Sequence, residues 1–265
     1  MNASDDLELL QSAVHAAGSI ARNYYGGEVR RWNKAGGSPV TEADLAVDKF
    51  LKQTLCAARP DYGWLSEESV DSLVRLERRR VFVVDPIDGT VAFLKQRPHF
   101  TICAAVVEAG RPYAGAVYNP ISEEFYAAAA GQGATLNGAA IHAGDRDSIE
   151  GARMLGPKNL FAGDGWPHVE VTTLSSIAYR IVRVAAGWQD AMVSLTVKHD
   201  WDLAAADVIV HEAGGVLSDQ AGRRLLYNRP TATQRATIAA GPKLHGLLLE
   251  HLRQIEGLES RSSPL

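Results

Sequence analysis

Apolar residues recur every three or four positions in two segments near the start of the chain, as in amphipathic helices. The first segment follows Ser4, a candidate N-cap, and ends near Gly26. The second begins at Thr41, which is followed three positions later by Asp44, and it ends at Pro60. A cap residue with an acid at that spacing favours a helix start. The sequence therefore predicts two helices in this region.

Unbroken apolar runs follow, and they favour buried strands. Residues 64–65 form a short run, and residues 81–84 (Val-Phe-Val-Val) lead directly into Asp85. Further strands are predicted at residues 101–108, 112–118 and 124–129, with glycine- or proline-containing turns between them. We therefore expect a sheet to follow the two helices.

The second half of the chain alternates between strand and helix patterns. We expect strands near residues 153–156, 191–195, 216–217 and 236–240, helices at residues 175–186, 201–213 and 242–255, and a disordered tail at residues 256–265. The chain turns polar around residues 144–150. We therefore divide it into an N-terminal α+β half (1–145) and a C-terminal α/β half (146–265). A length of 265 residues favours one compact unit of two packed halves.

The charge balance limits the classes of partner. The chain has 27 Lys and Arg against 31 Asp and Glu, a net charge of −4. Non-specific nucleic-acid binders are usually strongly basic, so nucleic acid is not expected as a partner. Residues 78–80 (Arg-Arg-Arg) can be a phosphate or nucleic-acid patch or a solvated face, and the acidic whole favours the solvated face.

The sequence also predicts a cytoplasmic protein. No apolar run approaches the ~18 residues of a membrane span, so no membrane contact is expected. Asp5, Asp6 and Glu8 stand where a signal peptide needs a basic region. Cys56 and Cys103 lie in apolar stretches and are predicted to be reduced, buried thiols.

The strongest chemical signal is at residues 85–90, which read Asp-Pro-Ile-Asp-Gly-Thr. A tight turn stiffened by Pro86 can aim Asp85 and Asp88 at one point. Two such carboxylates repel each other unless a cation or proton lies between them. Because the candidate ligands are oxygen atoms, the cation is expected to be Mg²⁺, Mn²⁺ or Ca²⁺ rather than zinc. An ordinary surface turn is the alternative, because these residue types all favour turns. The buried strand that precedes the turn favours a functional site.

The end of this turn predicts an anion site beside the cation site. Gly89 permits close approach of a ligand to the backbone. If a helix begins near Gly89 or Thr90, its free backbone amides point at the same place as the carboxylates. A phosphate group would bind well there.

Two further acids are candidates for the same site. Glu67 follows the short apolar run at residues 64–65, and Asp202 lies in the first turn of the helix predicted at residues 201–213. Each also has an ordinary explanation, Glu67 as a surface acid and Asp202 as a helix cap.

Four segments together resemble the inositol monophosphatase superfamily, which includes fructose-1,6-bisphosphatases and 3′(2′),5′-bisphosphate nucleotidases. They are residues 38–44 (Ser-Pro-Val-Thr-Glu-Ala-Asp), 66–68 (Ser-Glu-Glu), 85–90 and 201–206 (Trp-Asp-Leu-Ala-Ala-Ala), in the family's order over nearly the whole chain. The resemblance implies an α/β sandwich of alternating helix and sheet layers, with the site between the two halves. It also implies a Mg²⁺-dependent phosphomonoesterase that acts on a small-molecule phosphate ester, is inhibited by Li⁺ and forms a homodimer.

By this resemblance, two metal ions would share five ligands. The first Mg²⁺ would be held by Glu67, Asp85 and the backbone carbonyl of Ile87. The second would be held by Asp85, Asp88 and Asp202. A third ion is compatible with the family pattern, and Mn²⁺ can substitute for Mg²⁺.

The resemblance also implies catalytic and substrate-binding roles. Glu67 and Thr90 would orient and activate the attacking water, and Asp44 would accept a hydrogen bond from Thr90. The substrate phosphate would be held by the Gly89 and Thr90 amides, close to Asp88 and Asp202.

Substrate recognition is where the sequence departs from the pattern. Inositol monophosphatases usually carry a glutamate seven residues before the aspartate of the Trp-Asp pair, and here that position is Leu195. Ser66 before the two glutamates and residues 93–95 (Phe-Leu-Lys) are more similar to bacterial bisphosphate nucleotidases. The favoured substrate is therefore 3′-phosphoadenosine 5′-phosphate, and the alternatives are inositol 1-phosphate, histidinol phosphate and sugar phosphates.

Several nearby residues have more than one possible role in substrate recognition. Lys95, Arg97 or Lys198 can supply a cation for a second phosphate, and Asp200 can replace the missing acid. Lys198, His199 and Asp200 can equally be a solvated loop. A family member that serves as a binding partner in an RNA or transcription complex is the non-enzyme alternative. Loss of one or more of the family's metal-ligand residues would favour this alternative, whereas every ligand position carries the expected residue here.

Overall fold

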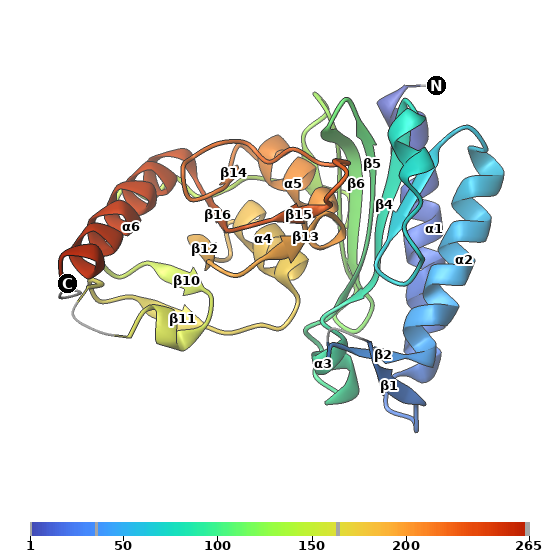
Figure 1. Ribbon diagram of the computed structural model, residues 1–265, viewed down its shortest axis with the longest axis horizontal. Coiled ribbons are helices and arrows are strands. Elements are labelled where there is room, and N and C mark those ends of the chain that lie inside the picture. Colours follow the sequence, from blue (N-terminus) through green and yellow to red (C-terminus); the bar gives the residue numbers. More distant parts are fainter. Residues whose placement is uncertain (1, 35–36, 163–164, 263–265) are drawn as a thin grey trace.

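Helix and sheet layers alternate along the long axis of the molecule (Figure 1). The computed structural model describes residues 2–34, 37–162 and 165–262. Helices α1 (Ala3–Tyr24) and α2 (Glu42–Ala58) cover one face of a large sheet, and α4 (Ile177–Ala185) and α5 (Asp200–Glu212) cover the other. A smaller sheet and α6 (Pro242–Ser262) follow. No helix in the described ranges is both long and apolar enough to span a membrane.

The large sheet has seven strands in chain order, from β3 to β9. Its first pair is parallel and the others are antiparallel. The strands are β3 (Gly63–Ser66), β4 (Arg80–Asp88), β5 (Thr101–Glu108), β6 (Arg111–Asn119), β7 (Glu124–Ala129), β8 (Ala134–Leu136) and β9 (Ala139–Ile141). The register between β4 and β5 shifts between Asp85 and Asp88. Such a bulge bends a strand and changes where its side chains point.

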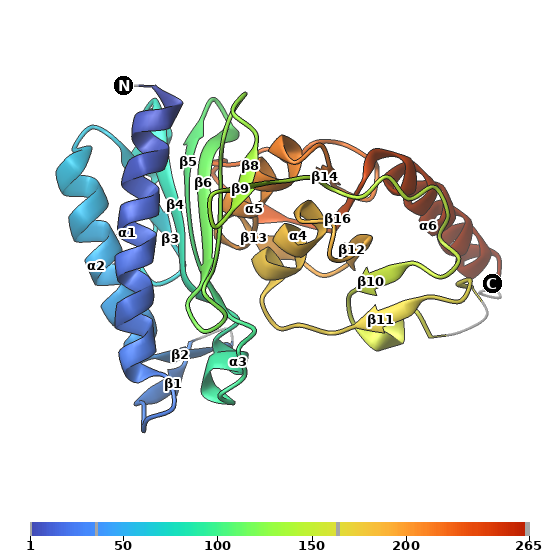
Figure 2. The same cartoon turned by 180° about the vertical axis from the view of Figure 1, so that it is seen from behind.

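The smaller sheet has five strands in the order β11-β10-β12-β16-β14. They are β10 (Arg153–Leu155), β11 (Glu170–Thr172), β12 (Ala191–Ser194), β14 (Val216–Ser218) and β16 (Thr237–Ala240). Figure 2 shows the segment after β9 crossing from the large sheet to this one. Short pairs and turns complete the fold: β1 (Arg31–Asn33) with β2 (Pro39–Thr41), β13 (Lys198–His199) with β15 (Thr233–Gln234), α3 (Thr90–Leu94), and the 3₁₀ turns Leu73–Glu77 and Lys158–Leu160.

Residues 81–84 of strand β4 are all apolar because both faces of the large sheet are covered. Phe82 and Val84 pack in the cluster beneath α1 and α2, whereas Val81 and Val83 pack in the cluster that contains Ile209 of α5. All are 0–1% exposed. Burying a side chain of this size contributes about 1.5–3 kcal/mol. The continuous apolar run in the sequence is therefore the signature of a central strand.

Helix boundaries follow the predicted capping logic, with two corrections. Thr41 and Asp44 form the predicted capping box at the start of α2. The first helix is capped by Asn2 rather than Ser4, because Asn2 forms a capping box with Asp5. The last helix continues to Ser262, so residues 256–262 are not the predicted disordered tail. The prediction failed because these residues, apart from Gly257, are ones that a helix tolerates. Residues 263–265 lie outside the described ranges, and the division at residue 145 stays a prediction.

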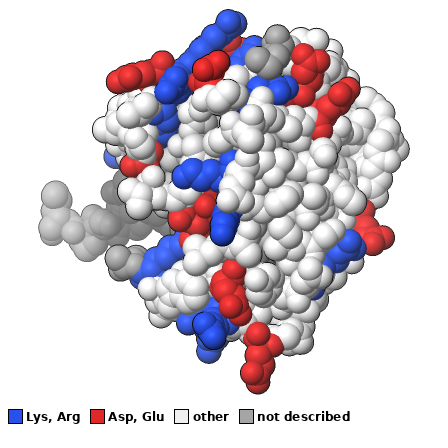
Figure 3. Space-filling model, turned by 90° about the vertical axis from the view of Figure 1, so that its right-hand side faces the viewer, with Lys and Arg blue, Asp and Glu red and all other residues white. Residues whose placement is uncertain are grey.

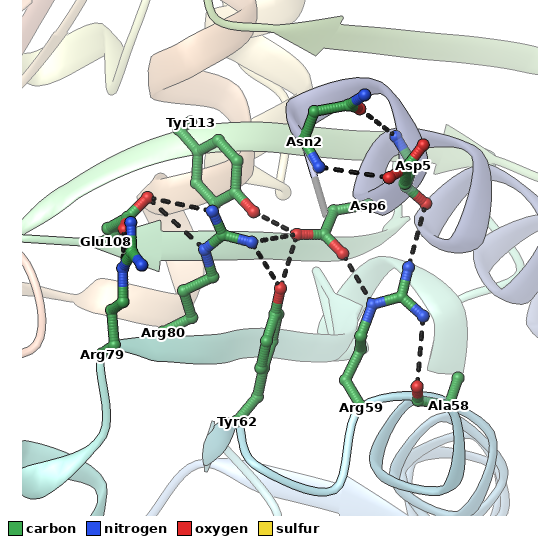
Figure 4. Close-up of polar contacts among 10 residues, drawn as sticks. All are labelled: Asn2, Asp5, Asp6, Ala58, Arg59, Tyr62, Arg79, Arg80, Glu108 and Tyr113. Carbon is green, nitrogen blue, oxygen red and sulfur yellow. Dashed lines mark hydrogen bonds and ion pairs between the residues drawn. The ribbon is translucent and has the colours of Figure 1, made fainter.

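A buried carboxylate ties the outer helices to the large sheet (Figure 4). Asp6 is 0% exposed and accepts hydrogen bonds from Arg59 (2.9 Å), Tyr62 (2.8 Å), Arg80 (3.3 Å) and Tyr113. These partners come from the end of α2, the turn before β3, and strands β4 and β6. Because a buried carboxylate is costly without such donors, this cluster fixes α1 on the sheet.

The arginine run at residues 78–80 is largely engaged within the protein. Arg79 and Arg80 both pair with Glu108, and Arg80 also pairs with Asp6. Figure 3 shows positive and negative side chains interspersed on the face that carries α1 and α2. The prediction of a surface face rather than a nucleic-acid patch fits this arrangement.

Candidate active site

A cavity of about 350 Å³ brings the predicted site residues together between the two halves. Its walls come from the ends of β3 and β4, the start of α3, and the first turn of α5. It is lined by Ser38, Pro39, Glu67, Asp85, Ile87, Asp88, Gly89, Thr90, Val91, Ser175 and Asp202. Of the predicted site residues, only Asp44 does not line the cavity. It accepts a hydrogen bond from the hydroxyl of Thr90, which does line it.

The end of β4 supplies two carboxylates that are held by protein donors. Asp85 is 1% exposed and accepts the Ile87 amide at 3.0 Å. Asp88 accepts the Ser176 hydroxyl at 2.5 Å and the Ala178 amide at 2.7 Å. The second contact joins β4 to the first turn of α4, so the tertiary fold, not the turn alone, orients Asp88.

Gly89 makes the turn possible. Its φ of +98° lies in the left-handed region, where a side chain is strained. A Cβ there would also lie 2.9 Å from the His99 carbonyl oxygen and 3.1 Å from the Ser176 amide. Helix α3 then begins at Thr90, which meets the condition for an anion site at this turn, and the amides of a first helical turn lack intrahelical acceptors.

Thr90 and Asp44 form the hydrogen bond that the resemblance implies. The Thr90 hydroxyl lies 3.1 Å from Asp44 Oδ1 and 3.1 Å from the Ile87 carbonyl oxygen. Asp44 uses its other oxygen in the capping box with Thr41. One carboxylate therefore both starts α2 and fixes the Thr90 hydroxyl, and burial raises its pKa.

Glu67 follows β3 and pairs with a lysine from the β1–β2 connection. Lys34 Nζ lies 2.8 Å from Glu67 Oε1 and 2.7 Å from Glu68 Oε1. Burial raises the pKa of Glu68 to about 7, although Lys34 opposes this. The ammonium group shows that this corner of the cavity favours a cation.

Asp202 reaches the cavity from the third position of α5. Its Oδ2 accepts the His199 amide at 2.7 Å, so Asp202 also contributes to capping α5, as the third-position acid of a capping box whose N-cap is His199. The two readings of Asp202 are therefore compatible.

Crowding of acids dominates the electrostatics of the cavity. Burial and the neighbouring Glu67 and Asp88 raise the pKa of Asp85 well above its usual value. Burial raises the pKa of Asp88 to about 6, and burial with repulsion from Asp88 raises that of Asp202 to about 8. Burial and mutual repulsion outweigh the positive charge of Arg180 near Asp88 and of Lys198 near Asp202, and a divalent cation would supply further positive charge there.

The donor chemistry fits a hard cation such as Mg²⁺, because all candidate ligands are carboxylate or carbonyl oxygens. Within the described ranges, no three His, Cys, Asp or Glu side chains already form a closed metal cage. The reason is visible in the contacts: Lys34, Ser176 and His199 each engage an oxygen of one candidate ligand.

Comparison with known proteins decides the family. The family model described as "Inositol monophosphatase family" matches residues 3–256. The chain belongs to the inositol monophosphatase family. This is a family of phosphatases that use divalent metal ions, and membership confirms the resemblance found in the sequence.

Relatives within the family carry two kinds of name. The chain is 31% identical to the inositol-1-monophosphatase of Rhizobium meliloti (strain 1021), over 82% of this chain and 86% of that protein. It is 29% identical to the Nus factor SuhB of Escherichia coli (strain K12), over 80% of this chain and 84% of that protein.

Solved structures confirm the layered α/β fold. Thermotoga maritima IMPase matches with a TM-score of 0.84 and 26% identity, covering 96% of this chain and 98% of that one. The extragenic suppressor protein suhB from Bartonella henselae matches with a TM-score of 0.82 and 27% identity, covering 94% and 98%.

This member of the inositol monophosphatase family also uses residues that the sequence did not single out. Ser176 caps α4 and positions Asp88, and Ser175 lines the cavity. Arg180, partly buried on α4, interacts electrostatically with Asp88. A helix start near residue 175 was predictable, but nothing in the sequence indicates that this turn reaches β4.

The residues before Trp201 have different environments in this inositol monophosphatase family member. Asp200 is 0% exposed, and its two oxygens accept the Asn228 amide and the Gln234 side chain, each at 2.8 Å. Asp200 is therefore structural, and it does not replace the missing acid. His199 stacks on Trp201 with ring centroids 4.4 Å apart, and Leu195 is 42% exposed.

Proposed function

We propose that this protein is a Mg²⁺-dependent phosphomonoester hydrolase. The observation that carries the proposal is the convergence of Glu67, Asp85, Asp88 and Asp202 on one cavity. Glu67, Asp85 and the Ile87 carbonyl would hold one ion, and Asp85, Asp88 and Asp202 a second. Bound there, Mg²⁺ or Mn²⁺ supplies positive charge to the phosphate and lowers the pKa of a water molecule.

The residues of this chain would position the reactants. The Thr90 hydroxyl, held by Asp44, accepts a hydrogen bond from the attacking water, and Glu67 accepts a proton from it. The Gly89 and Thr90 amides at the start of α3 donate to the phosphate oxygens. For Glu67 to act in this way, its ion pair with Lys34 would have to open, which would free Glu67 to hold the first ion.

We further propose 3′-phosphoadenosine 5′-phosphate as the substrate. A polyol needs buried acceptors for its hydroxyl groups, and Leu195 offers none while Asp200 is fully engaged. A nucleotide with a second phosphate instead needs a cation. Arg180 and Lys198 interact electrostatically with Asp88, so they are better placed than the predicted Lys95 and Arg97.

Inositol 1-phosphate is the competing substrate, supported by the name of the Rhizobium meliloti relative. Parallel steady-state assays with Mg²⁺ decide between the two. We expect a higher kcat/KM for 3′-phosphoadenosine 5′-phosphate, and we expect Lys198→Ala to raise its KM more than that of inositol 1-phosphate. Lys243→Ala, an exposed lysine on α6, is the matched control. A clear preference for inositol 1-phosphate, or for histidinol or sugar phosphates, would contradict the assignment.

A binding role is the alternative from another class, because relatives are named Nus factor SuhB. The net charge of −4, and the mixed charges on the α1–α2 face that Figure 3 shows, argue against a nucleic-acid surface on that face. Absence of phosphate release from every tested ester with Mg²⁺ present would favour this role. By family resemblance we also propose a homodimer and inhibition by Li⁺, which is hard like Mg²⁺ but carries half its charge.

A further inference from the structure

A second, larger cavity lies in the C-terminal half. It measures about 780 Å³ and is formed by the connection between β14 and β15. In Figure 1 this connection runs from β14 toward the large sheet and returns to β15. Two contacts hold it against the β5–β6 turn: Tyr227 donates its amide to the Gly110 carbonyl, and Arg111 donates to the Leu225 carbonyl. The cavity shares no lining residue with the catalytic one.

Positive charge dominates this second cavity. Its lining contains four arginines, Arg223, Arg224, Arg229 and Arg235, against a single acid, Asp219. The excess is three positive charges (4 − 1) in a chain whose net charge is −4. We name these residues the arginine cleft.

Most of that charge is not neutralised within the protein. Among the described residues, Asp219 forms an ion pair only with Arg223, at 2.8 Å. Arg229 donates to the Thr233 carbonyl oxygen, which carries no formal charge, and it also interacts electrostatically with the buried Asp200. In the ranges that the structure describes, Arg224 and Arg235 make no side-chain hydrogen bond or ion pair. A guanidinium group has five donors in a planar fork that matches phosphate, so these side chains favour a phosphate ligand.

The shape of the arginine cleft favours a small molecule. Its volume is in the range of small-ligand pockets. Leu226, 47% exposed, and Pro230 add an apolar wall beside the cations. An RNA would need a basic track that extends beyond the cleft, and the acidic chain does not favour one.

We propose that the arginine cleft binds a small organic phosphate with at least two phosphate groups, at a site distinct from the catalytic cavity. Arg224 and Arg235 are the principal phosphate contacts, and the apolar wall packs against the organic part. This site does not depend on the proposed hydrolase activity.

Isothermal titration with adenosine 5′-diphosphate in excess EDTA tests the proposal, because EDTA removes metal-dependent binding in the catalytic cavity. We expect one molecule to bind per chain, and Arg224→Ala and Arg235→Ala each to weaken binding at least about tenfold. Both arginines are exposed, so the variants should fold. Gln234 is left intact because it holds Asp200.

Two control variants make the result specific. Arg78→Ala removes an exposed arginine outside the arginine cleft, and Asp88→Asn alters the catalytic cavity; both should bind adenosine 5′-diphosphate like the wild type. Absence of binding, binding unchanged in Arg224→Ala and Arg235→Ala, or binding lost in Asp88→Asn would overturn the proposal. Binding of a single-stranded RNA that requires Arg224, without binding of the diphosphate, would also overturn it.

Discussion

The candidate site depends on single atoms that come from distant parts of the sequence. The Thr90 hydroxyl and Asp44 Oδ1 lie 3.1 Å apart, and Ser176 holds Asp88 from another element. The sequence indicates Asp85, Asp88 and Gly89, because two aspartates and a glycine in a turn directly after a buried strand favour a binding site over an ordinary surface turn. It does not indicate Ser176 or Lys34, since a serine cap and a loop lysine occur in many other settings.

Thr90→Ala tests the role of the hydroxyl. We expect normal folding and a fall in kcat of about 10²–10⁴, the usual range for a residue that positions a transferred proton. Thr90→Ser keeps a hydroxyl at the same place and should retain most activity. Steady-state kinetics with thermal melts as the folding check provides the measurement. A near-wild-type kcat in Thr90→Ala would show that the hydroxyl does not orient the water.

Lys34→Met tests whether the ammonium group competes with a metal ion for Glu67. Removing a positive charge 2.8 Å from Glu67 Oε1 should strengthen Mg²⁺ binding several-fold in titration calorimetry. Lys49→Met, an exposed lysine on α2, should leave the Kd for Mg²⁺ unchanged. Weaker Mg²⁺ binding in Lys34→Met would mean that the lysine supports the metal site instead of opposing it.

At the level of elements, long segments with strong patterns were predictable, whereas most strands of two or three residues were not. Strands β4, β5 and β7 and helices α2, α4 and α5 lie within a few residues of their predicted positions. Seven of the described strands, each of two or three residues, were missed, because such short segments carry no periodicity and are fixed by their partners: β1, β2, β8, β9, β11, β13 and β15.

The turn before β4 contains a buried arginine that links it to the start of α5. Arg75 is 2% exposed and donates to Asp71, to Asn228 Oδ1 (2.6 Å) and to the Arg229 carbonyl (3.0 Å). Asn228 in turn donates its amide to Asp200, the first residue of α5. This chain of contacts fixes the helix that carries Asp202.

Arg75→Met should therefore destabilise the fold. Two partly buried acceptors, Asn228 Oδ1 and the Arg229 carbonyl, would lose their donor, and a fully buried acceptor left without one costs about 1–3 kcal/mol. Arg78→Met, an exposed change in the same segment, should stay within about 0.5 kcal/mol of the wild type. Urea unfolding gives both values. Equal stability of the two variants would show that the Arg75 contacts contribute little.

For the whole molecule, one hydrophobic cluster spans both halves of the chain. Val83 and Val117 of the large sheet pack in the same cluster as Ile181 and Ile209 of α4 and α5. The C-terminal half therefore completes the core of the N-terminal half, and the cavity forms where they meet. Sequence patterns alone left Glu67 and Asp202 with ordinary explanations, because their convergence on Asp85 is a property of this packing. Only the resemblance to the inositol monophosphatase superfamily placed Glu67 and Asp202 in the same site as Asp85.

Phosphate release from 3′-phosphoadenosine 5′-phosphate and inositol 1-phosphate during a Mg²⁺ titration tests the central claim most directly. Wild-type protein should release no phosphate in excess EDTA and should regain activity as Mg²⁺ is restored. Asp88→Asn, which keeps the shape of the side chain but removes one charge from the shared site, should fold and yet lose kcat by orders of magnitude. Full phosphate release in excess EDTA, or an unchanged kcat in Asp88→Asn, would contradict the account.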